Sequence, residues 1–426
     1  MDIYIKKLGT FLILVLGIYA VGFAQQDSVS VTTEIRKNEK NPTKGSVYLT
    51  PVPILGFNPA FNFMYGLGGT ASWFLGNPSN TSISSAVLGI IFTTKQQQMI
   101  SLRSTTYTNE NKWQIIGDVR YFDTSQSTWG LGTGSQKTKP TFGEINIGGI
   151  NYQGISTEDP MEFKLIRIYE TFLHKIGESG VYAGVGVHID LHRNIKDLGM
   201  EEHNENVDTP TAITPYWAYS KVKDFNYNHS STVGISLNAV YDTRDNINNP
   251  YVGRYAMLSF RVNPEIIGSD KNSTQLNLEY RDYINLTENN HNILALWGIG
   301  NFTLSGDLPY LCLPAIGWDL YGTSGAPYTQ GRFRGEDLIF AGLEYRKHIW
   351  GTKWNPRLVG AIAFLNATTV SGGGINHARL FDYIAPGYGL GLRINFRKKA
   401  RTNLGFDYGW GAYGSKGFFI RINENF

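Results

Sequence analysis

The sequence has little cysteine, little charge and few long apolar runs. Its single cysteine, Cys312, cannot form an internal disulfide or a thiolate metal cluster. Charged residues make up 17% of the 426 residues, which is low for a soluble protein, and the net charge of +3 is too small to indicate nucleic-acid binding. After the first 24 residues, no segment approaches the unbroken apolar length of a spanning helix. If the chain resides in a membrane, we therefore expect it to cross as strands.

Residues 1–24 have the pattern of a signal peptide. Lys6 and Lys7 precede an apolar run over 8–21, which is too short for a retained membrane anchor, and small residues flank Phe23 at the expected cleavage site. Residues 25–50 that follow are polar and charged, and they are too few for a folded domain. We expect them to be a flexible periplasmic segment.

Glycine and aromatic residues are abundant where charge is scarce. The chain has 48 Gly, 25 Tyr and 23 Phe but only 6 Met, and this mixture is more typical of glycine-kinked strands and aromatic girdles than of a helical core. Near the end of the chain, glycine, Arg393 and Asn395 alternate with large apolar residues: Tyr388, Leu390, Leu392, Ile394 and Phe396. A soluble antiparallel sheet could alternate in this way. The size of the apolar residues and the persistence of the pattern favour an outer-membrane barrel with lipid on one side and a polar lumen on the other.

The same period-two pattern recurs along the chain from residue 51 to residue 426. The predicted fold class is therefore all-β: a single transmembrane antiparallel barrel of about sixteen strands over 51–426. The segment 142–155 has the weakest pattern, and the polar stretch 194–230 is expected to be a loop. The predicted strands are 58–73, 82–94, 97–106, 112–122, 142–155, 163–173, 181–190, 233–241, 256–262, 275–284, 293–304, 338–349, 358–370, 387–397, 403–410 and 417–423.

The connections fall into two length classes. If residue 426 lies in the periplasm, the short turns fall on the periplasmic side and the long stretches at 193–230, 305–336 and 371–385 fall outside, which is the asymmetry of outer-membrane barrels. The stretch 305–336 carries several apolar residues, which an exposed loop has little reason to contain. We therefore expect this loop to fold into the lumen.

The sequence contains few motifs for catalysis, metal binding or cofactor binding. Asp242, Arg244 and Asp245 could form a metal loop, but a tight turn requires the same residue types, and the turn is the favoured interpretation. The glycines at 372–374 lack the lysine and helix of a phosphate loop, the histidines show no ligand spacing, and no nucleophile motif is present. The sequence thus predicts no catalytic residue, no cofactor and no metal site, and we do not expect an enzyme.

Five charged residues form a possible dock for the long loop. Period two places Glu344, Arg346 and Arg393 on the glycine-rich inward face, while Arg332 and Arg334 lie at the end of the loop. A carboxylate in a partly dry lumen needs a cation, so we expect Arg332 or Arg334 to pair with Glu344 or a nearby acid. The alternative is a polar lining in which Glu344 pairs with Arg346 or Arg393.

Four segments resemble the BamA/TamA superfamily, the bacterial surface antigen barrels. A turn motif resembles the family's periplasmic turn, and residues 331–346 resemble the place where the inward loop runs into the twelfth strand. Residues 386–409 resemble the last strands, and residues 415–422 match the terminal insertion signal. By this resemblance the turn motif consists of Asp242, Arg244, Asp245, Pro250 and Gly253, and the insertion signal consists of Gly417, Ile420, Ile422 and Phe426.

The resemblance implies a function in the outer membrane of a Gram-negative bacterium. Such barrels assemble, insert or translocate proteins or lipids through a weak seam between the first and last strands. The implied partners are outer-membrane lipid, the outer-membrane assembly machinery and client proteins or lipids. The chain departs from the family in two respects. Residues 25–50 are too few for a periplasmic POTRA domain, so the chain resembles a short, POTRA-less branch. The loop tip also differs: either Tyr321 stands where the tip normally carries an arginine, or Arg334 and Gly335 form the tip and Glu336 replaces the aromatic residue. The alternatives are a passive, porin-like channel and, less favoured, a lipid-modifying enzyme.

Overall fold

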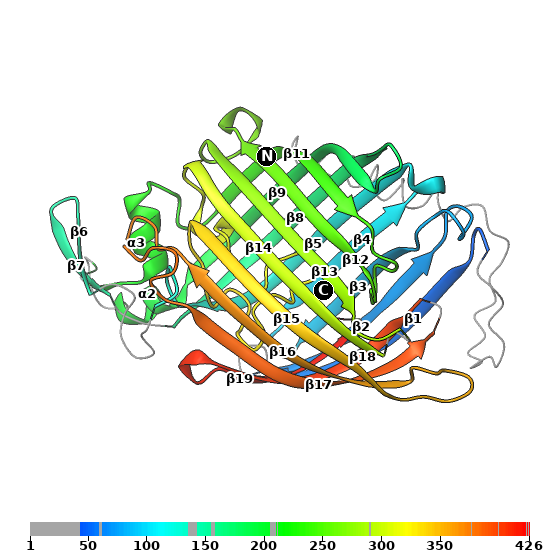
Figure 1. Ribbon diagram of the computed structural model, residues 1–426. Coiled ribbons are helices and arrows are strands. Elements are labelled where there is room, and N and C mark those ends of the chain that lie inside the picture. Colours follow the sequence, from blue (N-terminus) through cyan, green and yellow to red (C-terminus); the bar gives the residue numbers. More distant parts are fainter. Residues whose placement is uncertain are drawn as a thin grey trace.

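The protein is a barrel made from one sixteen-stranded antiparallel sheet (Figure 1). The computed structural model describes residues 43–58, 62–134, 143–154, 158–204, 210, 212–288, 291–375, 377–398, 400–422, 424 and 426. The expected all-β barrel and its number of strands are confirmed. The strands are β1 (Val47–Asn58), β2 (Asn62–Trp73), β3 (Ser84–Thr93), β4 (Gln98–Tyr107), β5 (Trp113–Thr128), β8 (Asp159–Ile176), β9 (Val181–Asp197), β11 (Ser230–Asp242), β12 (Gly253–Asn263), β13 (Ser273–Asn285), β14 (Asn292–Gly306), β15 (Asp337–Trp350), β16 (Val359–Val370), β17 (Ala385–Arg397), β18 (Thr402–Gly411) and β19 (Lys416–Ile422).

The strands alternate between an apolar outer face and a polar inner face. In β17, Leu390 and Leu392 are 61% and 54% exposed, whereas Arg393, one residue further along, is 4% exposed. Many of the side chains exposed on the outside of the barrel are large and apolar, and many charged side chains, Arg393 among them, are buried in the lumen. This arrangement is the one expected when the outer face contacts lipid.

One of the sixteen predicted strands was wrong and one strand of the barrel was missed, so the total was still right. The first barrel strand is β1, which begins at Val47 inside the segment expected to be flexible. The predicted strand 142–155 is instead a hairpin of β6 (Glu144–Ile147) and β7 (Ile150–Gly154), which pairs with β10 (Ala212–Ile213) in a separate three-stranded sheet. Alternation shows that a segment is a strand but not which sheet it joins. The signal peptide and residues 25–42 lie outside the described residues.

The predicted loop 194–230 contains regular structure. Strand β9 continues to Asp197 and leads into α2 (Leu198–Asn204), and α3 (Pro215–Val222) follows β10. Thr214 caps α3, because its hydroxyl accepts from the Trp217 amide at 3.2 Å, and Pro215 suits the first helical position. No helix in the described part of the chain is long and apolar enough to cross a membrane.

The two ends of the barrel differ. The short-turn end is the one where β8 leads to β9, β11 to β12, β13 to β14 and β17 to β18, and we call the opposite end the long-loop end. Figure 1 shows α2, α3 and the β6–β7 hairpin together at the long-loop end. There, Tyr216 and Tyr219 of α3 pack with Leu308, Tyr310 and residues of β8 in a buried apolar cluster. This cluster caps the lumen at the long-loop end.

The short helical turns complete the described elements: η1 (Asn109–Asn111), η2 (Glu265–Ile267), η3 (Tyr310–Cys312) and η4 (Ala412–Gly414).

Candidate functional site

Residues 307–336, which we call the lumen loop, connect β14 to β15 and fold into the barrel. The loop contacts opposite walls. Gln126 of β5 donates to the Gln330 carbonyl at 2.6 Å, while Asn366 of β16 donates to the Ala326 carbonyl at 2.6 Å. The Tyr328 hydroxyl donates to the Pro386 carbonyl at the start of β17, and burial raises the pKa of Tyr328 to about 12. The expected inward fold of this loop is confirmed.

The tip of the loop is a closed turn built on Asp319. Its carboxylate accepts from the backbone amides of Tyr321, Thr323 and Ser324 at 2.9–3.2 Å, so the charge is met within the loop. The tip therefore keeps its shape through its own backbone and presents its carbonyl groups to the barrel wall.

Two arginines of the barrel wall hold those carbonyl groups. Arg120 of β5 donates to the carbonyls of Asp319 and Leu320 at 3.0 and 3.3 Å, and Arg103 of β4 donates to the Leu320 carbonyl at 3.2 Å. Arg120 also makes two 2.7 Å bonds to Asp118, which fix its guanidinium in place. Sequence reasoning missed all three wall residues, because β4 and β5 alternate only weakly.

Aromatic residues of the tip lie against further wall arginines. The guanidinium of Arg281 on β13 lies 5.7 Å from the Tyr321 ring centre, and that of Arg167 on β8 lies 5.1 Å from the Trp318 ring centre. Tyr321 occupies the position where an arginine was expected by resemblance. In these contacts the aromatic group is on the loop and the arginine is on the wall.

Arg334 and Arg332 do not make the predicted carboxylate contact. Arg334 is 2% exposed, and its Nη1 donates to the carbonyls of Tyr310 and Leu311 at 3.1 and 2.9 Å, so it closes the base of the loop. Burial away from an acid lowers the pKa of Arg334 below its ordinary value. Arg332 lies over the rings of Trp129 and Tyr413 at 4.9 and 5.1 Å. Both arginines hold the loop, but through carbonyl groups and aromatic rings.

Glu344 pairs along its own strand. Arg346 Nε donates to Glu344 Oε1 at 2.6 Å, which is the alternative that the sequence left open. Arg393 lies near them but pairs with Asp407 of β18 and with Glu424, whose Oε2 accepts from Arg393 Nε at 2.7 Å. Arg421 of β19 meets the other Asp407 oxygen at 2.7 Å. We call these six residues the charge cluster: Glu344, Arg346, Arg393, Asp407, Arg421 and Glu424.

A glycine makes room for the charge cluster. A Cβ at Gly391 would lie 1.9 Å from Asp407 Oδ1, so any larger residue at 391 would displace that carboxylate. Asp407, Arg421 and Glu424 were not predicted as part of the site. Period two placed Asp407 and Arg421 on the inward faces of the last two strands, and that pattern could have identified both.

The end of the chain folds into the lumen. Phe426 is 8% exposed; its ring lies 5.0 Å from Trp297, and its main-chain oxygen accepts from Arg346 Nη2 at 2.8 Å. The assignment of Phe426 to the insertion signal is not tested by this position and stays a prediction. An aromatic ring beside an arginine and Trp297 is more completely buried in the lumen than it would be on a lipid-facing strand.

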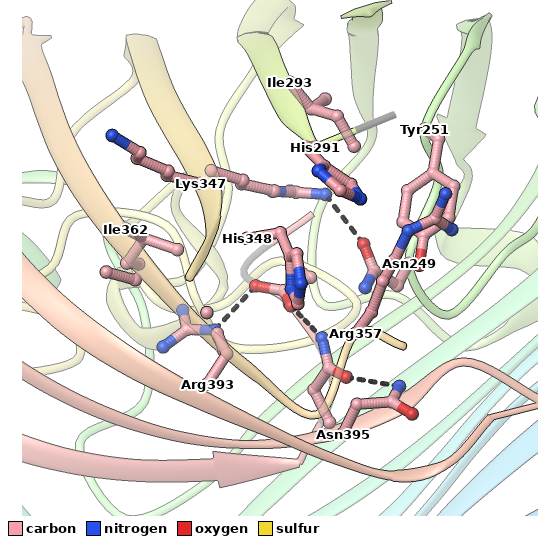
Figure 2. Close-up of a pocket in the computed structure, with 15 residues that line it drawn as sticks. Asn249, Tyr251, His291, Ile293, Lys347, His348, Arg357, Ile362, Arg393 and Asn395 are labelled. Atoms are coloured by element: carbon pink, nitrogen blue, oxygen red, sulfur yellow. Dashed lines mark hydrogen bonds and ion pairs between the residues drawn. The ribbon is translucent and has the colours of Figure 1, made fainter. Parts of the chain in front are cut away.

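The pocket in Figure 2 lies beside the charge cluster at the short-turn end. The figure shows Asn249, Tyr251 and His291 on one side of it, with Arg393 and Asn395 on the other. The His291 and His348 rings lie 4.7 Å apart, and the Arg357 guanidinium lies 4.5 Å from the Tyr251 ring centre. The pocket has a volume of about 60 Å³, and Arg346 and Glu424 also line it.

The turn motif between β11 and β12 is held by its own charges. Arg244 binds Asp242 through two bonds of 2.8 and 2.9 Å, and Asp245 accepts from the amides of Tyr251 and Val252 at 2.9 and 3.3 Å. Although burial disfavours the charged guanidinium, Asp242 raises the pKa of Arg244 well above its ordinary value. These contacts account for the acidic residues as parts of a turn.

The other two residues of the motif complete the turn. Gly253 has φ +106°, and a Cβ there would lie 2.3 Å from the Thr243 carbonyl oxygen. Pro250 is buried, and its carbonyl lies 3.5 Å from Arg346 Nη1. The turn therefore reaches the charge cluster.

The remaining residues of the predicted insertion signal lie on β19. Ile420 is 58% exposed on the outer face, Ile422 is half-buried, and Gly417 lies on the inner face near the start of the strand. No described contact tests their role in insertion, which stays a prediction.

The sheet has two edges, and they are its first and last strands. The strand order runs from β1 to β19, and among the described residues these two strands are not paired with each other. Arg397, at the end of β17, donates to the Leu49 carbonyl of β1 at 2.9 Å, so the edges approach each other at the short-turn end. We call the junction of β1 and β19 the seam.

The free edge of β1 lacks two hydrogen-bond donors. Alternate residues of an antiparallel strand face one neighbour. The Ser46 carbonyl accepts from the Phe74 amide at 3.2 Å, so even-numbered residues face β2 and odd-numbered residues face the seam. Pro51 and Pro53 are odd-numbered and have no N–H group. The free edge of β1 therefore cannot form a complete ladder of hydrogen bonds with another strand. Proline is tolerated at such positions because the N–H group of an edge strand need not bond to a neighbour.

Comparisons with known proteins agree with this architecture. The chain matches the Omp85 superfamily domain over residues 65–310, which is more than half of its length. No curated protein matches it.

Two solved structures align with most of this chain. BamA from Haemophilus ducreyi lacking POTRA domains 1–3 aligns with 90% of this chain and 71% of its own, at 17% identity and a TM-score of 0.49. CdiB from Acinetobacter baumannii aligns with 88% of this chain and 59% of its own, at 13% identity and a TM-score of 0.50. This chain thus spans less than two thirds of CdiB.

Proposed function

The chain belongs to the Omp85 superfamily of outer-membrane proteins, and from that premise we propose that it inserts or translocates polypeptides through the seam between β1 and β19. The proposal places the short-turn end in the periplasm and the long-loop end outside the cell. The observation that carries it is the free edge of β1, in which Pro51 and Pro53 remove two donors where β19 would pair.

The free edge of β19 is complementary to an incoming strand. The Gly411 amide donates to the Ser415 carbonyl at 2.8 Å, so the odd-numbered residues of β19 face β18. The main-chain groups of Lys416, Phe418, Ile420 and Ile422 then face the seam, and each of these residues has both a donor and an acceptor. An edge of this kind can pair with a client strand, because β-augmentation uses main-chain hydrogen bonds. A lipid offers no such ladder, so we assign a polypeptide client.

The lumen loop supports a lateral route over an axial one. It contacts β5 and β16 on different walls, and the apolar cluster of α3 and Tyr310 covers the long-loop end. A passive channel requires an open lumen. With the lumen filled, the seam is the route left for a client strand to reach lipid.

The test is a reversible lock across the seam. Cysteine replaces Leu49 in β1 and, in separate variants, Phe418 or Ile420 in β19, with Cys312 changed to Ser so that no other thiol is present. The matched control places cysteines at Phe172 and Val185, which are partners on β8 and β9 and so already paired. Each variant replaces the natural copy in cells, and outer-membrane and surface proteins are quantified after oxidation and again after reduction.

The proposal expects the oxidised seam lock to deplete a subset of outer-membrane or surface proteins, and reduction to restore them. The oxidised control should leave them unchanged. Efficient cross-linking of the seam with an unaltered set of outer-membrane and surface proteins would contradict the proposal.

A further inference from the structure

A cavity of about 260 Å³ lies in the lumen beneath the loop tip. Strands β5, β8, β9, β11, β12, β13 and β14 line it on the wall side, and residues of the lumen loop, among them Cys312, Trp318 and Asp319, line it on the loop side. The volume is near the lower end of the roughly 300–1,000 Å³ typical of small-molecule sites. The proposed seam mechanism makes no use of this cavity.

The part of the cavity nearer the long-loop end has nitrogen atoms without partners. Among the described residues, Arg261 Nη2, His188 Nδ1 and Trp318 Nε1 have no hydrogen-bond partner, and all three residues line the cavity. Arg261 and His188 are 5% and 9% exposed. His188 Nε2 lies 2.7 Å from the Ser236 hydroxyl; in the tautomer that accepts this bond, Nδ1 carries the proton. The three atoms then form a set of donors, and buried donors require acceptors.

The same part of the cavity has one positive charge too many. Arg167 pairs with Asp190 at 2.7 Å, and Arg261 lies 4.0 Å from the same carboxylate, so two guanidinium groups share one acid. The other acids that line the cavity have their own arginines: Asp118 pairs with Arg120 and Glu279 with Arg281, while Arg103 interacts with Asp319. A buried excess charge is costly unless a counter-ion meets it.

The opposite part of the cavity is mostly apolar, and Glu279 of β13, which lies opposite Met257, is paired there with Arg281. Along β12, from the short-turn end, the lining changes from Tyr255 and Met257 to Ser259 and Arg261. Strand β8 runs the other way and changes from Arg167 and Tyr169 to Leu173. On β11, Asn238 is followed by Val240. On these three strands the lining changes from a cationic, donor-rich end to a mostly apolar end, while β13 keeps the Glu279–Arg281 pair beside Met257.

We infer that this cavity binds an amphiphilic carboxylate, whose head group accepts from Arg261, His188 and Trp318 and whose apolar chain lies along Leu173, Val240 and Met257. A carboxylate supplies the single negative charge that the Arg167–Asp190–Arg261 group lacks, and it can accept two hydrogen bonds from one guanidinium. The apolar chain of the ligand covers the apolar end of the cavity and removes it from water, which stabilises binding in proportion to the area covered.

The test is calorimetric titration of octanoate into the protein in lipid nanodiscs, with empty nanodiscs titrated as the background. Acetate retains the head group without the chain, and octylammonium retains the chain with the opposite charge. We expect saturable binding of octanoate to one site, at least tenfold weaker binding of acetate, and no binding of octylammonium. No saturable octanoate binding, equal affinity for acetate, or binding of octylammonium would overturn the inference.

The matched variants are Arg261→Gln and Arg254→Gln, both on β12. The Arg254 side chain is 61% exposed and lies outside the cavity. Arg261→Gln should weaken octanoate binding at least tenfold, and Arg254→Gln should leave it unchanged. Equal octanoate binding by wild type and Arg261→Gln would contradict the assigned head-group site.

A second measurement needs no substitution, in case Arg261→Gln fails to assemble. Cys312 lines the cavity and is the only cysteine, so its reaction with a small thiosulfonate reports occupancy. Saturating octanoate should slow this reaction several-fold and acetate at the same concentration should not. An octanoate-independent rate would place the ligand elsewhere and overturn the inference.

Discussion

The guanidinium of Arg281 lies 5.7 Å from the ring centre of Tyr321. The contact joins the inner wall of β13 to the tip of the lumen loop, and Glu279 holds Arg281 in place through a 2.8 Å bond to its Nε. The tip thus docks through an aromatic group that meets a fixed arginine, together with carbonyl groups that meet Arg103 and Arg120. Docking of the loop tip in this barrel therefore depends on cations of the wall.

Replacing Tyr321 by Ala should loosen the loop tip, whereas Phe should preserve it. The cation–π contact contributes about 0.5–2 kcal/mol and depends on the ring, which Phe retains. Limited proteolysis of the purified barrel should show faster cleavage within 315–331 for Tyr321→Ala and a wild-type rate for Tyr321→Phe. Equal cleavage rates for Tyr321→Ala and wild type would show that the contact does not hold the tip.

Gly391→Ala should disrupt the charge cluster. The added Cβ would lie 1.9 Å from Asp407 Oδ1, and relief of that clash separates Asp407 from Arg393 or Arg421. Overpacking of this kind costs about 1–3 kcal/mol, and the weakened ion pairs add to the loss. The urea midpoint of unfolding should fall. Gly298→Ala on β14 is the matched control, since no atom lies within 4 Å of its added Cβ, and a fall of the same size there would assign the effect to the strand backbone.

Cys312 should react slowly with iodoacetamide in the folded protein. Burial raises the pKa of its thiol to about 12, and only the thiolate is nucleophilic. Against an ordinary pKa of 9.0, the thiolate fraction at pH 8 is lower by about a thousandfold. The alkylation rate should therefore rise about tenfold per pH unit from pH 8 to 11. A rate in the native barrel that levels off near pH 9 would mean that the thiol is not held in this environment.

Ile420→Lys should impair assembly of the barrel itself. Ile420 is 58% exposed on the outer face, and a lysine on the lipid face costs up to about 2–4 kcal/mol near mid-membrane and less near the interface. The amount of heat-modifiable barrel in the outer membrane should fall. Lys416→Ala, at the exposed start of the same strand, is the control and should leave the amount unchanged. Normal levels of Ile420→Lys would remove this position from the insertion signal.

Much of the barrel could be predicted from the sequence, because successive side chains of a strand point to opposite faces and the residue types therefore alternate with a period of two. It missed β1 because Pro51 and Pro53 normally argue against a strand, and an edge strand is the exception. It placed the β6–β7 hairpin in the wall because Ile145 and Ile147 alternate with polar residues just as wall strands do. The alternation of polar and apolar residues shows which face of a sheet a side chain lies on, but it does not show which strand pairs with which.

The candidate site was predicted only in part. Inward placement of Glu344, Arg346 and Arg393 follows from their strands, and the Glu344–Arg346 pair is formed by residues two apart on one face. The partners of Arg334 could not be predicted, because the carbonyl groups of Tyr310 and Leu311 depend on the path of the loop. The inward fold of Phe426 depends on contacts with β14 and β15, which have no counterpart in local sequence.

The most direct test of a lumen filled by its own loop is the conductance of single barrels in a planar lipid bilayer. The lumen loop reaches opposite walls, so we expect a mostly closed state with brief, small openings, and much larger, long-lived conductance steps when residues 315–331 are replaced by a short Gly-Ser linker. Steady, large steps from the unaltered protein, of the same size as those from the linker variant, would contradict the plugged barrel and indicate a passive channel.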